Sequence, residues 1–264
     1  MKLGFIGTGN MASAIMGGII KNQIIPANDI IGADVMEAGR ERVKEQFKIQ
    51  VTADNNEVIN SSDIVILSVK PQFYAEIIAE IKNDVREDQI IITIAPGKTL
   101  AWLKEQFGKN VKIVRTMPNT PALVGAGMTA ACPNEYMTKE EIAYVLTLLE
   151  SFGRVEIIPE RLMDTVVSVS GSSPAYIFMF IEAMADAAVS GGMPRAQAYQ
   201  FAAQAVLGSA KMVLETGKHP GELKDMVCSP AGTTIEAVRV LEEKGFRSSV
   251  IEAMKTCEEL SRSM

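Results

Sequence analysis

The residues of this chain best suited to chemistry begin with a glycine-rich stretch at residues 7–12, Gly-Thr-Gly-Asn-Met-Ala. The stretch matches the pattern G-x-G-x-x-A, follows a short apolar run at residues 3–6 and opens a helical pattern from Asn10 to Lys21. A strand, a glycine turn and a helix in this order bind dinucleotides, because the helix N-terminus presents N–H groups and a positive dipole to phosphate. The motif therefore predicts a dinucleotide cofactor.

Each small residue of this motif has its own role. Gly7 permits the tight turn after the strand, Gly9 lets the backbone approach a pyrophosphate, and Ala12 lets the helix pack closely on the strand. Asn10 and Met11 form the first helical turn beside the phosphates. A glycine turn without a ligand is the alternative interpretation, and the flanking strand and helix count against it.

Asp34 follows the second expected strand, residues 30–33. A carboxylate about 20 residues beyond the glycine motif accepts hydrogen bonds from the adenosine ribose and repels a 2′-phosphate. It therefore favours NADH over NADPH. Arg40 and Arg42 are close enough in sequence to offer rival contacts to a phosphate, and a solvated surface aspartate is the remaining alternative.

Two further expected strands end in candidate cofactor-binding residues. The apolar run at residues 64–69 leads into Lys70 and Pro71, and the run at residues 90–94 leads into Ala95. Ligands bind at the carboxyl edge of parallel sheets, so we expect Val69, Lys70, Pro71 and Ala95 near the cofactor. Taken alone, Lys70 fits a surface lysine before a proline-capped loop better than a ligand contact.

A second candidate site interrupts the later part of the chain at residues 229–234, Ser-Pro-Ala-Gly-Thr-Thr. Free backbone N–H groups at Gly232, Thr233 and Thr234 would bind an anion such as a substrate carboxylate. A threonine hydroxyl there can hydrogen-bond a substrate nitrogen. The simpler interpretation is an ordinary helix cap by Ser229 or Thr233.

Strand-like and helix-like patterns alternate through the first part of the chain, which predicts a doubly wound parallel sheet of the Rossmann type. The expected strands cover residues 3–6, 30–33, 64–69, 90–94 and 111–115, and the expected helices cover residues 10–21, 37–47, 74–81 and 100–107.

Beyond about Pro159 the pattern changes, and from Ser173 onward only helical periodicity remains. Pro174, Pro194 and Pro220 are good helix starts, whereas glycines at residues 191–192, 217 and 245 are good stops. We therefore expect two domains. A dinucleotide-binding Rossmann domain covers residues 1–160, and an all-helical domain for substrate binding and dimerisation covers residues 161–264.

The composition and charge of the chain argue against several classes of function. The 264 residues carry a net charge of −6 and no basic stripe, which argues against nucleic acid as a partner. Cys132, Cys228 and Cys257 lie far apart, so they indicate neither a disulfide framework nor a metal site and suit a reducing cytoplasm. The N-terminus does not resemble a signal peptide, and the apolar stretch at residues 175–189 is short and contains two acidic residues. We expect no membrane association.

Several segments resemble the pyrroline-5-carboxylate reductase family. They are PGELKD at residues 220–225, SPAGTTIEA at 229–237 with LE at 241–242, SGSSPAY at 170–176, RTMPNTP at 115–121 and VKP at 69–71. Their order and spacing are similar from Gly4 to about Arg247, which is nearly the whole chain.

The resemblance implies an oxidoreductase of proline biosynthesis that reduces the ring C=N bond of 1-pyrroline-5-carboxylate with NAD(P)H. It implies a homodimer through the helical domain, assembled further into a larger homo-oligomer. Thr234 would be the catalytic residue, near the ring nitrogen. Positions that match the family's cofactor site are Asn10, Met11, Asp34, Asn55, Val69 and Lys70, and positions that match its substrate site are Glu160, Thr233 and Thr234.

Two departures from the family pattern concern the cofactor. Asp34 replaces a small hydroxyl residue, and Met226 stands where a polar residue is expected.

Two rival functions also fit the expected two-domain arrangement. A β-hydroxyacid dehydrogenase or another imine reductase shares it, although residues 175–189 lack the lysine that the hydroxyacid enzymes use. A non-catalytic sensor of dinucleotide or proline-like ligands is the other. The single histidine, His219, argues against a histidine–carboxylate dyad for acid–base catalysis and is better explained as a loop or capping residue.

Overall fold

The computed structural model describes residues 1–263, which form two compact units. The first unit contains residues 1–172 together with the end of the chain from Cys257 onward. The second unit contains Ser173–Thr256 and is entirely helical. The expected domain boundary after residue 160 falls a little before this division.

The first unit is built on one eight-stranded sheet in the order β3-β2-β1-β4-β5-β6-β7-β8. Neighbouring strands are parallel except for β6 and β7. The strands are β1 (Leu3–Ile6), β2 (Ile30–Ala33), β3 (Gln50–Thr52), β4 (Ile64–Leu67), β5 (Ile90–Thr93), β6 (Lys112–Met117), β7 (Gly127–Pro133) and β8 (Gly153–Ile157).

The five strands that the sequence predicts are all parallel, and the one antiparallel pair joins β6 to β7, a strand that the sequence did not predict. Only the short helical turn η3 (Thr120–Val124) connects β6 to β7. A parallel neighbour needs a crossover of a dozen residues or more, so the short connection forces β7 to return antiparallel. The crossover helix α6 (Lys139–Glu150) then makes β8 parallel to β7.

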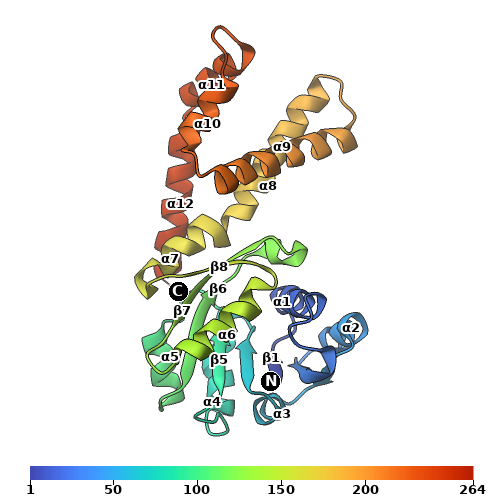
Figure 1. Cartoon of the computed structure of the whole chain (residues 1–264), viewed down its shortest axis with the longest axis vertical. Helices are drawn as coiled ribbons and strands as arrows, with labels where there is room; N and C mark the ends of the chain where they lie inside the picture. Colours follow the sequence, from blue (N-terminus) through green and yellow to red (C-terminus); the bar gives the residue numbers. More distant parts are fainter. Residues whose placement is uncertain (264) are drawn as a thin grey trace. The chain divides into compact units, whose positions relative to one another are not determined.

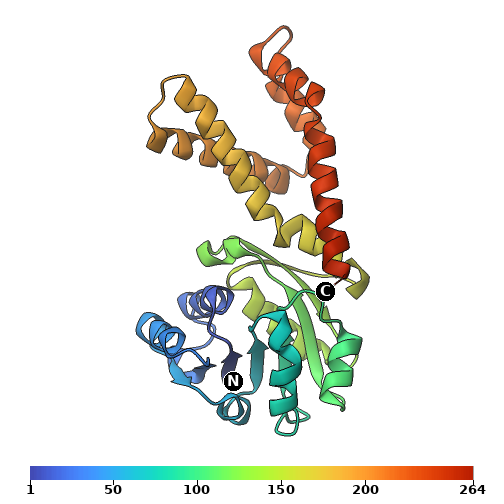
Figure 2. The ribbon, with the colours of Figure 1, turned by 180° about the vertical axis from the view of Figure 1, so that it is seen from behind.

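Helices cover both faces of the sheet, as the continuous apolar strands predict. Leu3 and Phe5 of β1 pack in one core with α1 (Asn10–Lys21), α2 (Glu37–Phe47) and α6, and Ile6 packs in a second core on the other face. The second core includes residues of α3 (Asn55–Ser61), α4 (Tyr74–Ile81) and α5 (Leu100–Phe107). Figures 1 and 2 show these two faces.

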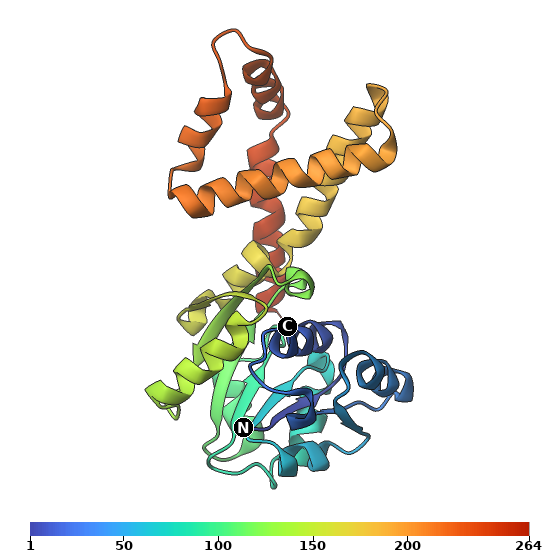
Figure 3. The ribbon, with the colours of Figure 1, turned by 45° about the vertical axis from the view of Figure 1, so that its right-hand side comes forward.

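The second unit consists of the helices that proline and glycine positions predicted. They are α8 (Ser173–Ser190), α9 (Arg195–Thr216), α10 (Pro220–Val227), α11 (Thr233–Glu243) and the first part of α12 (Phe246–Arg262). Gly217 ends α9 in the left-handed conformation, at φ 63°, and Pro220 is the first residue of α10. Helices α8 and α9 pair as a hairpin (Figure 3).

The helical stretch Glu160–Ser190 is longer than the apolar pattern alone predicts. It runs through η4 (Glu160–Leu162), α7 (Met163–Val166), η5 (Val167–Gly171) and α8. By length and composition it could cross a membrane, and only 6% of its most apolar window is buried within the described residues. The helix continues on the N-terminal side of residue 175, so it extends beyond the apolar run at residues 175–189 that the sequence indicates.

Candidate active site

The glycine turn after β1 has no room for a side chain at its first position. Gly7 has φ +94°, and a Cβ placed there would lie 2.8 Å from the carbonyl oxygen of Ser68 and 2.9 Å from Cγ1 of Val69. Ser68 reinforces this approach, because its hydroxyl donates to the Gly7 carbonyl at 2.7 Å. The ends of β1 and β4 are therefore held together at this turn.

The start of α1 is open where a phosphate would approach. Gly9 is the N-cap residue and provides no side-chain hydrogen bond to the helix. A Cβ at Gly9 would meet nothing within 4 Å, whereas Ala12 is fully buried. The first-turn N–H groups at Asn10 and Met11 thus face a space that the protein leaves free, which fits a pyrophosphate.

A cavity of about 220 Å³ opens at the carboxyl ends of the central strands. It is lined by four of the residues predicted to bind cofactor, namely Gly7, Asp34, Asn55 and Val69. Val35, Phe73 and Ile77 add apolar walls, which suit a flat ring such as adenine. The strand order changes direction between β1 and β4, and this crevice is where doubly wound folds bind nucleotides.

The Asp34 carboxylate is tied to the glycine turn. Its Oδ2 accepts the Thr8 amide N–H at 2.8 Å and the Thr8 hydroxyl at 2.9 Å, while its Oδ1 accepts the Met36 N–H at 2.9 Å. A carboxylate has about four acceptor positions, so one stays available to a ligand. Among residues 1–263, no lysine or arginine lies within ion-pair distance of this carboxylate.

The two arginines of α2 contact backbone carbonyls rather than the Asp34 carboxylate. Arg40 Nη1 donates to the Asp34 carbonyl at 2.6 Å and to the Val35 carbonyl at 3.2 Å. Arg42 donates to the Thr8 carbonyl through Nη2 and to Asn10 Oδ1 at 3.4 Å through Nη1. The Arg42 guanidinium therefore lies at the glycine turn, and the Arg40 guanidinium lies at the backbone that follows β2.

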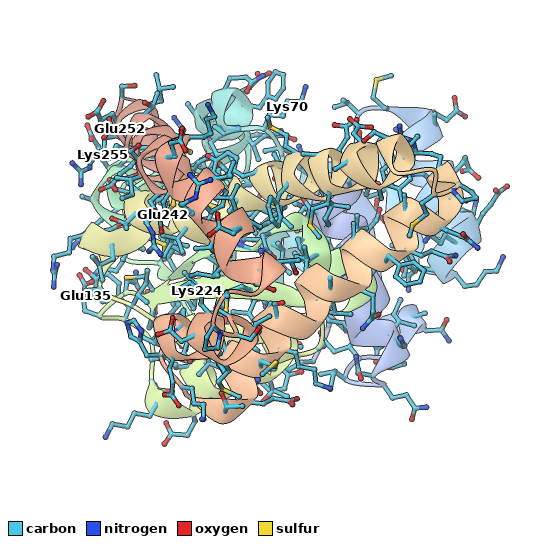
Figure 4. All side chains as sticks on the ribbon, turned by 90° about the horizontal axis from the view of Figure 1, so that it is seen from above. Lys70, Glu135, Lys224, Glu242, Glu252 and Lys255 are labelled. Carbon is cyan, nitrogen blue, oxygen red and sulfur yellow. The ribbon has the colours of Figure 1, made fainter. Side chains whose placement is uncertain are left out.

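The remaining predicted cofactor residues lie at the ends of β4 and β5. Exposed Lys70 is the N-cap of η2 (Pro71–Phe73), and Pro71 is its first residue (Figure 4). Ala95 is buried beyond β5, near the hydroxyl of Tyr74. That hydroxyl donates to the Leu67 carbonyl at 2.6 Å, and burial raises the pKa of Tyr74, so it serves as a neutral structural donor.

Glu160, a predicted substrate-binding residue, is engaged in a partly buried network. Its Oε1 accepts Arg115 Nη1 at 2.8 Å and the backbone N–H of Leu100, at the start of α5, at 2.7 Å. The Arg115 side chain is 3% exposed and that of Glu160 is 31% exposed. The carboxylate thus neutralises a buried cation through its Oε1.

At the turn before α11, one of the three backbone N–H groups that were expected to be free is already engaged in a hydrogen bond. The Gly232 N–H, predicted to be free, donates to the Ser229 carbonyl at 3.0 Å. Ala231 takes φ +56° to close this turn, and Gly232 becomes the N-cap without any side-chain cap. Neither Ser229 nor Thr233 caps the helix. The first-turn N–H groups of Thr233 and Thr234 have no intrahelical partner, so they remain the candidate anion donors.

His219 is the N-cap residue of α10, and Met226 lies on that helix, in the same unit. The His219 ring accepts the Gly221 N–H at 3.0 Å, which confirms the prediction of a capping residue. Met226 is 62% exposed. No group of three or more histidine, cysteine or acidic side chains arranged to hold a metal occurs among residues 1–263.

Sequence comparison reveals the family. A family model described as pyrroline-5-carboxylate reductase dimerisation matches residues 160–264, and one described as NADP oxidoreductase coenzyme F420-dependent matches residues 2–97. The pyrroline-5-carboxylate reductase of Escherichia coli is 55% identical over 267 residues, covering 100% of this chain and 98% of the relative. The chain belongs to the pyrroline-5-carboxylate reductase family.

Solved structures of pyrroline-5-carboxylate reductases share the whole fold. The enzyme of Coxiella burnetii superposes with a TM-score of 0.91 at 34% identity, covering 99% of this chain and 97% of that one. The Plasmodium falciparum enzyme, solved with NADP bound, also gives 0.91, at 31% identity, covering 100% and 97%. These matches confirm the predicted Rossmann domain with a C-terminal helical domain.

Sequence reasoning missed three residues at this pyrroline-5-carboxylate reductase site. Thr8 occupies a variable position of the glycine motif, so the pattern assigned it no role. Arg115 sits in an expected strand, where charge gave no hint of a partner 45 residues away. Phe73 precedes the helix expected at residues 74–81 and was assigned no role, yet it lines the cavity.

Proposed function

We propose that this chain reduces the C=N bond of 1-pyrroline-5-carboxylate with NAD(P)H and so makes proline. One observation carries the proposal: Gly7, Asp34, Asn55 and Val69, predicted separately, line one cavity at the switch point of the sheet. Membership of the reductase family agrees with this arrangement. The proposal makes the chain an NAD(P)-dependent oxidoreductase that acts on a small molecule.

The first unit would hold the cofactor. The open N-terminus of α1, at Gly9, Asn10 and Met11, would bind the pyrophosphate, and the cavity beside Asp34 would take the adenosine. Val69, Lys70, Pro71 and Ala95 would lie along the remaining edge of the sheet. Bound NAD(P)H supplies the hydride, and the chain contributes position and electrostatics.

The second unit would hold the substrate through the start of α11. The Thr233 and Thr234 N–H groups would bind the carboxylate, and the Thr234 hydroxyl would orient the ring nitrogen. Ser229 and Gly232 would shape this turn, since they close it through their own hydrogen bond. Glu160 stays a predicted substrate-binding residue, and its Oε1 is held by Arg115. A protonated imine is already electrophilic, so this chain's main task is orientation.

We also propose a preference for NADH. The support is the Asp34 carboxylate, which lines the cavity without a cationic partner among residues 1–263. An uncompensated carboxylate at this position repels a 2′-phosphate and accepts ribose hydroxyls. Arg40 and Arg42 are occupied with backbone carbonyls.

The helical unit supports homo-oligomer formation. An apolar groove of about 1000 Å³ runs between α8, α9 and α12 and includes Phe180, Met184 and Ile251. The family match over residues 160–264 is to a dimerisation domain. We infer that a second copy covers this groove and that dimers assemble further. The same burial would account for the apolar exposed face of Glu160–Ser190 without a membrane.

We place the enzyme in the cytoplasm. All three cysteines are free thiols, as a reducing compartment requires, and none of them pairs within the described residues.

A reductase assay tests the proposal. Purified protein is mixed with 1-pyrroline-5-carboxylate and with NADH or NADPH in turn, and both cofactor oxidation and proline formation are measured. Turnover to proline supports the proposal, and faster turnover with NADH supports the cofactor preference. Oxidation of a 3-hydroxy acid with NAD⁺ or NADP⁺, without turnover of 1-pyrroline-5-carboxylate, would favour a hydroxyacid dehydrogenase. Nucleotide binding without any turnover would favour a sensor.

A further inference from the structure

Thr8 makes more contacts at the cofactor site than its variable place in the motif predicts. Its amide and its hydroxyl both donate to Asp34 Oδ2, at 2.8 and 2.9 Å, and its carbonyl accepts from the Arg42 guanidinium. One fully buried residue therefore contacts both charged groups that could decide between ribose and 2′-phosphate. No other residue among 1–263 contacts both side chains in this way.

The Thr8 side chain fits between two glycines. A Cβ placed on Gly32 of β2 would lie 3.0 Å from Thr8 Cγ2, and one placed on Gly39 of α2 would lie 3.1 Å from Thr8 Oγ1. The missing side chains leave a slot that the threonine fills. Its χ1 rotation is restricted there, so the hydroxyl stays directed at Asp34.

We propose that Thr8 is the positioning residue that sets cofactor selectivity in this chain. Its two donors hold the Asp34 carboxylate facing the cavity, and its carbonyl holds the Arg42 guanidinium on the rim, away from a 2′-phosphate. The inference rests on the proposed NAD(P)H-binding site.

The physical reason is preorganisation. A charge-assisted hydrogen bond from the Thr8 hydroxyl fixes Asp34 before the ribose arrives, which lowers the ordering cost of binding. Without that hydroxyl, Asp34 can rotate toward Arg40 or Arg42 and form an ion pair. The pair would withdraw the ribose acceptor and remove the charge that repels a 2′-phosphate.

The test is calorimetric titration of the full-length oligomer with NADH and with NADPH. Thr8→Val keeps the branched shape and both backbone contacts but removes the hydroxyl. We expect the NADH dissociation constant to rise about tenfold, with the NADPH constant unchanged or lower. Thr8→Ser restores the hydroxyl and should return the NADPH-to-NADH ratio to within about twofold of the parent.

An equal change for both nucleotides, or no change for either, overturns the proposal, because a merely structural role would not alter the ratio. A double variant makes the assignment specific. Once Asp34→Ala has removed the carboxylate, Thr8→Val should change the ratio no further, and an undiminished effect would show that Thr8 does not act through Asp34.

Arg42→Gln covers the case in which Thr8→Val does not fold. Arg42 is exposed, so this variant should fold, and it should bind NADPH as the parent does. A tenfold loss of NADPH affinity would show that Arg42 already reaches the phosphate, which overturns the proposal. A parent that binds NADPH more tightly contradicts only the proposed NADH preference. A parent that binds neither nucleotide contradicts the NAD(P)H-binding site and this inference together, whereas binding without turnover contradicts only the reaction.

Discussion

Arg115 Nη1 lies 2.8 Å from Glu160 Oε1. This ion pair joins β6 to the first residue of the segment 160–264, which matches the dimerisation model of the family. The two partners differ in burial, since the arginine side chain is 3% exposed and the glutamate side chain 31%. The loss of either partner should therefore have unequal consequences.

Glu160→Gln should destabilise the protein more than Arg115→Met. Removing the carboxylate leaves a buried cation without a counter-charge, which costs about 3 kcal/mol, whereas removing Arg115 leaves a glutamate that water can solvate. Urea unfolding at one fixed protein concentration measures both free energies. The reverse order, or two losses below about 0.5 kcal/mol, would contradict this account of the pair.

Gly7→Ala and Gly9→Ala form a matched pair that separates folding from cofactor binding. A Cβ at Gly7 would clash with Ser68 and Val69 at a positive φ, so this variant should lose stability and cofactor affinity. A Cβ at Gly9 meets no protein atom within 4 Å, so the second variant should keep its melting temperature. It should nonetheless bind NADH about tenfold more weakly or worse, because the methyl group enters the phosphate space. Differential scanning fluorimetry and NADH titration provide the two measurements. Unaltered NADH binding by Gly9→Ala would refute the placement of the pyrophosphate.

Thr234→Ala should lower kcat/KM for 1-pyrroline-5-carboxylate by tens-fold or more while NADH affinity persists. The expected cause is loss of the hydroxyl that orients the substrate nitrogen. Steady-state kinetics and NADH titration check the two halves of the prediction. Thr147→Ala serves as the control, because Thr147 is exposed on α6 and its hydroxyl donates to the Ala143 carbonyl of the same helix. An unchanged kcat/KM would remove Thr234 from the mechanism.

Cys132 should react with thiol reagents much more slowly than Cys228. Burial raises the pKa of Cys132, with the Glu160 charge adding to the effect, and the thiolate is the reactive form. Cys132 is 8% exposed, whereas Cys228 is partly exposed. Mass spectrometry after timed labelling of native protein near neutral pH gives the order. Because a raised pKa keeps the thiol protonated, labelling of Cys132 should accelerate as the pH increases through the alkaline range, provided that the fold persists. Faster labelling of Cys132 than of Cys228 would argue against its buried position.

Ile251→Glu should dissociate the oligomer. The substitution places a charge in the apolar groove of the helical unit, where a second copy would have to desolvate it. Leu123→Glu is the matched control, since Leu123 is 56% exposed on η3 outside the groove. Analytical ultracentrifugation should show a smaller species for Ile251→Glu and the parental species for Leu123→Glu. An unchanged assembly in the first variant would place the interface elsewhere.

The local sequence determined those elements whose formation depends only on residues a few positions apart. The glycine turn, the helix starts at Pro194 and Pro220 and the ends of the apolar strands were all predictable, because backbone restrictions and periodicity act within a few residues. Helices α3 and α6 and strands β7 and β8 were not predicted, since their patterns are weaker and their pairing depends on neighbours far along the chain.

By itself, then, the sequence determined the dinucleotide-binding turn, the helical second half and the family. Tertiary structure alone decided how these parts are used. It turned β7 antiparallel, paired Arg115 with Glu160, engaged the Gly232 N–H within its own turn and placed Thr8 against both Asp34 and Arg42. The physical reason is that these outcomes depend on which distant groups meet and satisfy one another's hydrogen bonds, and no local pattern encodes that.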